Sequence, residues 1–109
     1  MNLRLYMAQR ITALVMAPLV MGHLAVMIYA IRGGLSTAEI LGRTQGSPVW
    51  FMFYGTFVLA VSIHGAIGLR TIAHEWGRLQ GAMLDVFMWV VGLGLFITGA
   101  RAVWAVTYA

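Results

Sequence analysis

The sequence contains no cysteine and no lysine, and only three of its 109 residues are acidic. Without cysteine the chain can form no disulfide, no thiolate metal site and no iron–sulfur cluster of its own. Any redox centre held by this chain must therefore use other ligands.

Charge of either sign is scarce. Only 9% of the residues are charged and 61% are hydrophobic, whereas a soluble domain is roughly a quarter charged and about half apolar. The seven basic residues are all arginines and give a net charge of +4, but they are spread along the chain at the ends of apolar runs. This distribution indicates anchors at a membrane edge and excludes a nucleic-acid-binding patch.

Three apolar stretches, at about 9–31, 50–73 and 83–106, are each long enough to cross a bilayer, which takes roughly 20 residues. The sequence thus predicts an all-α membrane protein with three transmembrane helices, forming one transmembrane domain over residues 1–109. Pro18 should kink the first helix because it leaves a backbone carbonyl without its N–H donor. Trp50 and Trp76 flank the second helix at headgroup depth.

Polar residues predict a loop after the first helix, and small residues predict a close helix contact in the third. Residues 35–48 are too polar for lipid and predict an external loop, in which Ser36 or Thr37 could cap one short helical turn. The third helix contains Gly92, Gly94 and Gly99, which would let another helix approach closely.

The arginines also predict an orientation. Arg4, Arg10, Arg70 and Arg78 should lie on one side of the bilayer, and Arg32, Arg43 and Arg101 on the other. Four against three favours a cytoplasmic N-terminus. Three helices from so small a chain would leave apolar faces uncovered, so partner subunits are expected.

Two histidines lie inside predicted helices, His23 in the first and His64 in the second. Placing a polar ring in the hydrocarbon core costs free energy unless the ring forms a hydrogen bond or binds a ligand. Each ring could donate a hydrogen bond to a neighbouring helix, or each could bind haem iron. Gly68, one turn from His64, would leave room for a flat macrocycle, and Arg70 could pair with a propionate or simply anchor the helix at the interface.

The motifs around these residues match a known pattern. The second helix reads His64, three residues, Gly68-Leu69-Arg70, then Glu75, Trp76 and Gly77, and the first reads Gln9-Arg10-Ile11-Thr12-Ala13. The chain resembles the cytochrome b membrane-anchor subunits of succinate dehydrogenase and fumarate reductase, respiratory complex II. In the larger anchor of that family, the second helix reads His, three residues, Gly, a branched apolar residue and Arg, followed by an acidic residue, an aromatic and a Gly. The first helix of the family reads His-Arg-x-Ser/Thr-Gly.

The resemblance implies that His64 is an axial ligand of haem b and that Arg10 lies near a quinone head group or a haem propionate. Tyr6 and Thr12 are further candidates for quinone contacts. Three positions depart from the family pattern, since Gln9, Ala13 and Tyr6 stand where the family has His, Gly and Ser. Tyr6 could still donate a hydrogen bond to a quinone carbonyl, or it could be an interfacial aromatic.

The resemblance also implies partners and a location. The chain would be the electron-transfer anchor of a succinate:quinone oxidoreductase of the respiratory chain and tricarboxylic acid cycle, in a bacterial inner membrane. It would contact an iron–sulfur subunit, a flavoprotein subunit and a second membrane anchor. No residue of this chain is expected to take part in the dicarboxylate chemistry, which would belong to the flavoprotein.

The depths of the two histidines differ. His23 lies 13 residues beyond Arg10, or about 20 Å along a helix, and His64 lies six residues before Arg70, or about 9 Å. If both arginines mark the same surface, the imidazoles are roughly 10 Å apart in depth and cannot bind one iron. Either His64 shares a single haem with a histidine of another subunit, or two haems stack across the membrane and His23 binds the outer one.

A cofactor-free transporter subunit or scaffold, whose histidines only bridge helices, is the alternative function. A proton-coupled transporter would usually carry an acidic residue near the middle of the membrane. Glu39, Glu75 and Asp85 all lie at or near the ends of the predicted helices, which counts against transport. His74, past the end of the second apolar stretch, is interpreted as a surface residue.

Overall fold

The computed structural model describes residues 3–108, which form four helices and, within that range, no strand. The helices are α1 (Leu3–Gly33), α2 (Thr37–Thr44), α3 (Pro48–Glu75) and α4 (Ala82–Thr107). By length and composition α1, α3 and α4 are each able to cross a membrane. The prediction of an all-α protein with three transmembrane helices is confirmed, and each predicted stretch lies within one long helix.

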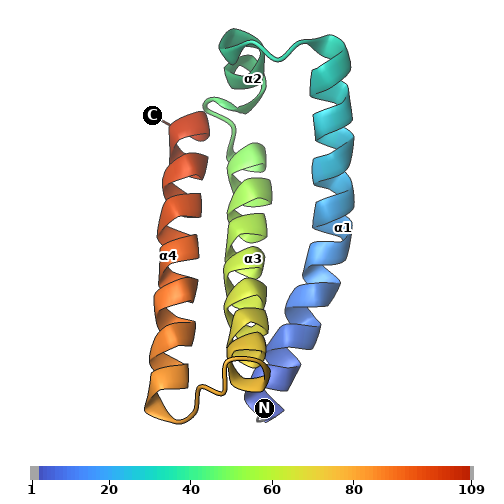
Figure 1. Cartoon of the computed structure of the whole chain (residues 1–109). Helices are drawn as coiled ribbons and strands as arrows, with labels where there is room; N and C mark the ends of the chain where they lie inside the picture. Colours follow the sequence, from blue (N-terminus) through green and yellow to red (C-terminus); the bar gives the residue numbers. More distant parts are fainter. Residues whose placement is uncertain (1–2, 109) are drawn as a thin grey trace.

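Helix α3 lies between α1 and α4 and packs against both (Figure 1). The start of α1 and the connection between α3 and α4 lie at one end of the bundle, while α2 and the end of α4 lie at the other (Figure 1). The two groups of arginines therefore lie toward opposite ends, as the sequence predicts. The cytoplasmic position of the N-terminus stays a prediction.

The helix ends follow from local chemistry. Gly34, with φ of 130°, adopts a backbone conformation that side-chain-bearing residues rarely take, and α1 ends just before it. The side chain of Ser36 accepts a hydrogen bond from the backbone N–H of Glu39 and caps α2. Ser47 caps α3 in the same way, with Pro48 at the first helical position. The prediction of a cap at Ser36 or Thr37 is confirmed for Ser36, and the helix that follows is longer than one turn.

Helix α2 is tied to the end of α4. Thr44, only 2% exposed, donates a hydrogen bond from Oγ1 to the carbonyl of Val106 at 2.7 Å. The backbone N–H of Gly46 donates to the carbonyl of Thr107. The last carbonyls of a helix have no partner within the helix, so these two bonds satisfy groups that α4 would otherwise leave unpaired.

Glycines set the spacing between α3 and α4, as predicted for two of the three. A Cβ at Gly92 would lie 3.2 Å from Cβ of Ala66, and one at Gly99 would lie 2.6 Å from Cγ1 of Val58. Gly94 faces open space within the described chain. The α3–α4 contact therefore depends on two missing side chains on one face of α4.

Helix α1 is continuous through Pro18 and changes direction along its length (Figure 1). The proline removes one backbone hydrogen bond inside the helix, which accounts for a change of direction in α1. Much of α1 is apolar and exposed, for example Leu14 at 74% and Met21 at 69%. Surfaces of this kind require lipid or other subunits to cover them.

Candidate functional site

His64 lies on the side of α3 that faces α1. Its Nδ1 is 3.2 Å from Oγ1 of Thr12, and this is a hydrogen bond between two membrane-spanning helices. Thr12 is buried, with 8% of its surface exposed. Within residues 3–108, no hydrogen-bond partner lies at the other ring nitrogen of His64, Nε2. The ring is therefore held at one nitrogen and open at the other.

Gly68, one turn beyond His64 on α3, also faces α1. A Cβ at Gly68 would lie 3.5 Å from Nε2 of Gln9, so the Gln9 amide lies beside the position where the sequence predicts room for a macrocycle. Oε1 of Gln9 is buried and has no hydrogen-bond partner in the described chain. Gly65 faces α4 instead, where a Cβ would lie 3.3 Å from Leu95. Both glycines thus serve helix contacts, a role that the sequence did not indicate for them.

His23 on α1 faces the first half of α3. Its ring lies 5.2 Å from the Phe57 ring and 6.3 Å from the Tyr54 ring, measured between centroids. No described residue forms a hydrogen bond with this imidazole. The bridging role that the sequence allowed for both histidines is therefore seen for His64, whereas His23 makes only ring contacts.

The two histidines lie at different depths, and the gap is larger than the sequence estimate. Thr12 lies opposite His64, and His23 lies opposite Tyr54. Eleven residues of α1 and ten residues of α3 separate these two levels, which is roughly 15 Å along either helix. The His23 ring lies nearer to the Phe57 ring, which is seven residues or roughly 10 Å from the level of His64. The conclusion that the two rings cannot bind one iron therefore holds.

The underestimate has a physical cause. The sequence argument placed Arg10 and Arg70 at the same surface. Because Thr12 is level with His64, Arg10 is level with about residue 66 of α3, roughly 6 Å deeper than Arg70. A long arginine side chain can extend toward the interface from this depth, so its position in the sequence marks the membrane edge only loosely.

Arg70 turns toward α4. Its guanidinium Nη2 is 3.3 Å from Oδ1 of Asp85, and the two side chains are 19% and 60% exposed. Asp85 lies in the first turn of α4, where a negative charge is also favourable with the helix dipole. The sequence placed Asp85 near the end of a predicted helix but did not indicate this ion pair, since no spacing rule links residues 15 apart on two helices.

Replacing Asp85 by Asn should change the stability of the assembled complex by less than about 1 kcal/mol. The carboxylate is largely exposed, and ion pairs of this kind are screened by water and salt. Thermal unfolding of the purified complex at low and high salt measures the effect. Glu75→Gln, which removes another exposed acid at the same end of the bundle, is the matched control. A loss above about 2 kcal/mol for Asp85→Asn alone would show that the pair has a larger structural role.

The residues considered for quinone binding are divided between two faces of α1. The guanidinium of Arg10 lies 5.8 Å from the centre of the Tyr6 ring, and both side chains are exposed. Thr12 points inward to His64. Arg10 and Tyr6 therefore form one exposed pair, and Thr12 is not part of it.

His74 lies at the surface, as the sequence indicated. Its Nδ1 is 2.9 Å from the carbonyl of Leu79 in the connection to α4, where Arg78 adopts a positive φ of 57°. The ring therefore helps to hold a strained turn.

Comparison with known proteins shows which family the chain belongs to. A family model described as succinate dehydrogenase/fumarate reductase transmembrane subunit matches residues 2–100. The chain belongs to this family. Neither a curated protein nor a solved structure matches the chain. The resemblance seen in the His64 and Arg10 motifs is confirmed, and the chain is a multi-pass membrane subunit of an oxidoreductase complex of the succinate dehydrogenase/fumarate reductase type.

Membership in the family implies that catalytic subunits are partners of this transmembrane subunit. Residues 3–108 contain no group of three or more His, Cys, Asp or Glu that could hold a bare metal ion. A haem iron needs no such group, because the macrocycle supplies four ligands and the protein supplies only axial ones. Single histidines on spanning helices are the donor set that suits haem.

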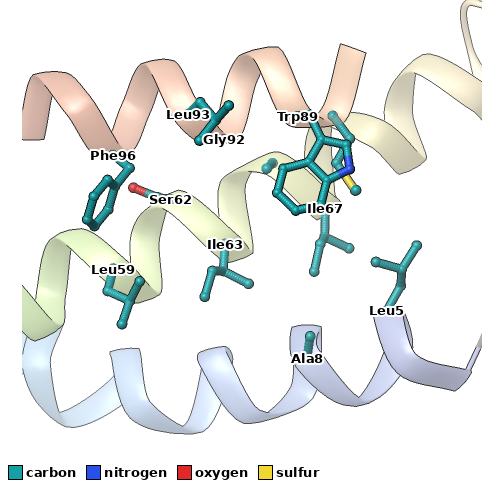
Figure 2. A pocket seen from close by; sticks show the side chains of 12 residues that line it. Leu5, Ala8, Leu59, Ser62, Ile63, Ile67, Trp89, Gly92, Leu93 and Phe96 are labelled. Carbon is teal, nitrogen blue, oxygen red and sulfur yellow. The ribbon is translucent and has the colours of Figure 1, made fainter. Parts of the chain in front are cut away.

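An apolar groove of about 400 Å³ lies between the three long helices (Figure 2). Leu5 and Ala8 line it from α1, Ile63 from α3, and Trp89 and Phe96 from α4 (Figure 2). His64 does not line this groove, and none of the lining residues is charged. The groove suits an apolar chain and offers no ligand to iron.

Proposed function

We propose that this transmembrane subunit binds haem b and passes electrons between an iron–sulfur subunit and membrane quinone. The observation that carries the proposal is the imidazole of His64, held at Nδ1 in the bundle and without a partner at Nε2 within residues 3–108. A ring nitrogen left open in hydrocarbon is costly unless it has a ligand. Family membership supports haem iron as that ligand.

The residues present suit the group. His64 would supply an axial imidazole, and haem would supply a centre that accepts and releases one electron at a time. The nearby Gln9 amide, whose Oε1 has no partner in the described chain, lies beside Gly68 and would border the site. Arg70 would meet a propionate only by sharing its guanidinium with Asp85. Axial ligation by His64 is thus the best supported contact, and the roles of Gly68 and Arg70 stay predictions.

His23 is the candidate ligand of a second haem. Its ring has no hydrogen-bond partner among the described residues and lies roughly 15 Å from the level of His64. Two haems at these depths would let electrons cross the bilayer in steps. If the complex holds one haem, His64 would share it with a histidine of a second anchor subunit.

The exposed Arg10 and Tyr6 pair is the candidate quinone contact. A guanidinium and a phenol hydroxyl can both donate hydrogen bonds to a quinone carbonyl. The pair lies near the start of α1, and the start of α1 lies at the same end of the bundle as the α3–α4 connection (Figure 1). We place the iron–sulfur and flavoprotein subunits at this end, on the cytoplasmic side of a bacterial inner membrane. This chain would leave the dicarboxylate reaction to the flavoprotein.

A reduced-minus-oxidised visible spectrum of the purified complex tests the proposal. We expect a b-type band, and the haem content per chain should be one or two. If the value is two, we expect His23 to bind the second haem, and His23→Ala should then halve the haem content. An intact complex without a b-type band would overturn the proposal and favour the cofactor-free scaffold. A transporter is less favoured, because Glu39 lies in α2, Glu75 at the end of α3 and Asp85 in the first turn of α4.

A further inference from the structure

The hydroxyl group of Thr12 forms hydrogen bonds both within α1 and to α3. Its Oγ1 lies 2.7 Å from the carbonyl of Ala8, one turn back on α1, and 3.1 Å from the carbonyl of Gln9. The same oxygen lies 3.2 Å from Nδ1 of His64. A hydroxyl has one hydrogen to donate and two lone pairs that accept. Since carbonyls can only accept, the hydroxyl hydrogen points to the α1 backbone and a lone pair faces His64.

This arrangement selects one form of the imidazole. A neutral histidine has a hydrogen on only one ring nitrogen. With a lone pair of Thr12 facing Nδ1, the favourable form carries its hydrogen on Nδ1 and donates it to Thr12. Nε2 then has a free lone pair, which is what a metal ligand requires.

We propose that Thr12 is a positioning residue for haem, which fixes the tautomer and the ring orientation of His64 and raises the electron density at Nε2. The inference rests on the proposed function, because it needs His64 to bind the iron. It assigns Thr12 a role different from the quinone contact considered from the sequence. Its 8% exposure and its direction toward α3 agree with that role.

The proposal predicts two effects of Thr12→Val, which keeps the shape of the side chain and removes the hydroxyl. Loss of a hydrogen-bond partner behind a ligating histidine typically lowers metal affinity by about 10- to 100-fold. Haem should therefore leave the purified complex faster when an excess of a haem-binding protein competes for it. The midpoint potential of the b-type band should also rise, because a less electron-rich imidazole stabilises ferric iron less.

The chain offers a matched control. Thr98 on α4 makes the same backbone contacts, from Oγ1 to the carbonyls of Gly94 at 2.8 Å and Leu95 at 3.2 Å, and within residues 3–108 it has no hydrogen bond to another helix. Thr98→Val should leave haem retention and midpoint potential unchanged. Thr12→Ser, which keeps the hydroxyl, should restore both toward the wild-type values. A purely structural role for Thr12 would not predict a shift in potential that serine reverses.

His64→Ala separates failure of this inference from failure of the proposed function. If His64→Ala removes the band, or half of it in a two-haem complex, while Thr12→Val keeps wild-type haem retention and potential, the haem assignment stands and the role of Thr12 is overturned. If His64→Ala keeps the full band, the ligand assignment itself is wrong. Should Thr12→Val fail to assemble, Thr12→Ala and Thr12→Ser still decide the matter. Equal behaviour of these two variants would overturn the proposal.

Discussion

Replacing His64 by Ala should abolish the b-type absorption of the haem that His64 binds. An axial imidazole is the main bond between this chain and the iron, and alanine offers no replacement. In a one-haem complex the band should vanish, and in a two-haem complex about half should remain. Visible difference spectra and haem extraction from the purified complex measure the loss.

His74→Ala is the control for this experiment. His74 lies on the same helix but at its exposed end, where it contacts the carbonyl of Leu79. Its removal should leave the full band. Co-purification of the catalytic subunits would show that each variant still assembles. A normal band in assembled His64→Ala complex would contradict the ligand assignment.

Replacing Gly99 by Ala should destabilise the bundle by about 1–3 kcal/mol, the usual cost of inserting a methyl group into a packed contact. The added Cβ would lie 2.6 Å from Cγ1 of Val58 and 3.0 Å from its Cγ2. Both branches of a stiff valine side chain are in the way, so α3 and α4 must move apart. Thermal unfolding of the purified complex measures the change.

Gly94→Ala is the matched control on the same helix. A Cβ at Gly94 meets nothing within 4 Å in the described chain, and alanine favours helix over glycine by about 1 kcal/mol. Stability should stay the same or rise. If both variants lose stability equally, close packing at Gly99 is not the cause. A loss confined to Gly94→Ala would instead indicate that a partner subunit packs against that position.

The site was only partly predictable from the sequence. His64 could be singled out because an imidazole in an apolar run is costly and because its neighbours match a family motif. Thr12 belonged to the other matched motif, but its hydrogen bond to His64 depends on how α1 slides along α3. The Gln9 and Gly68 contact has the same origin. The positions of Arg10 and Arg70 predicted a register between α1 and α3 that differs from the observed register by about four residues, roughly 6 Å.

The sequence by itself determined that three helices form and cross a membrane, because length, hydropathy and the terminal Ser, Pro and Gly residues act locally. It also determined that the chain has no cysteine ligands and that its motifs resemble those of the succinate dehydrogenase/fumarate reductase transmembrane subunits. Only the tertiary structure decided which groups meet: Thr12 with His64, Arg70 with Asp85, and Gly99 with Val58. These pairs depend on the rotation and register of packed helices, which many weak contacts set together and no short stretch of residues encodes.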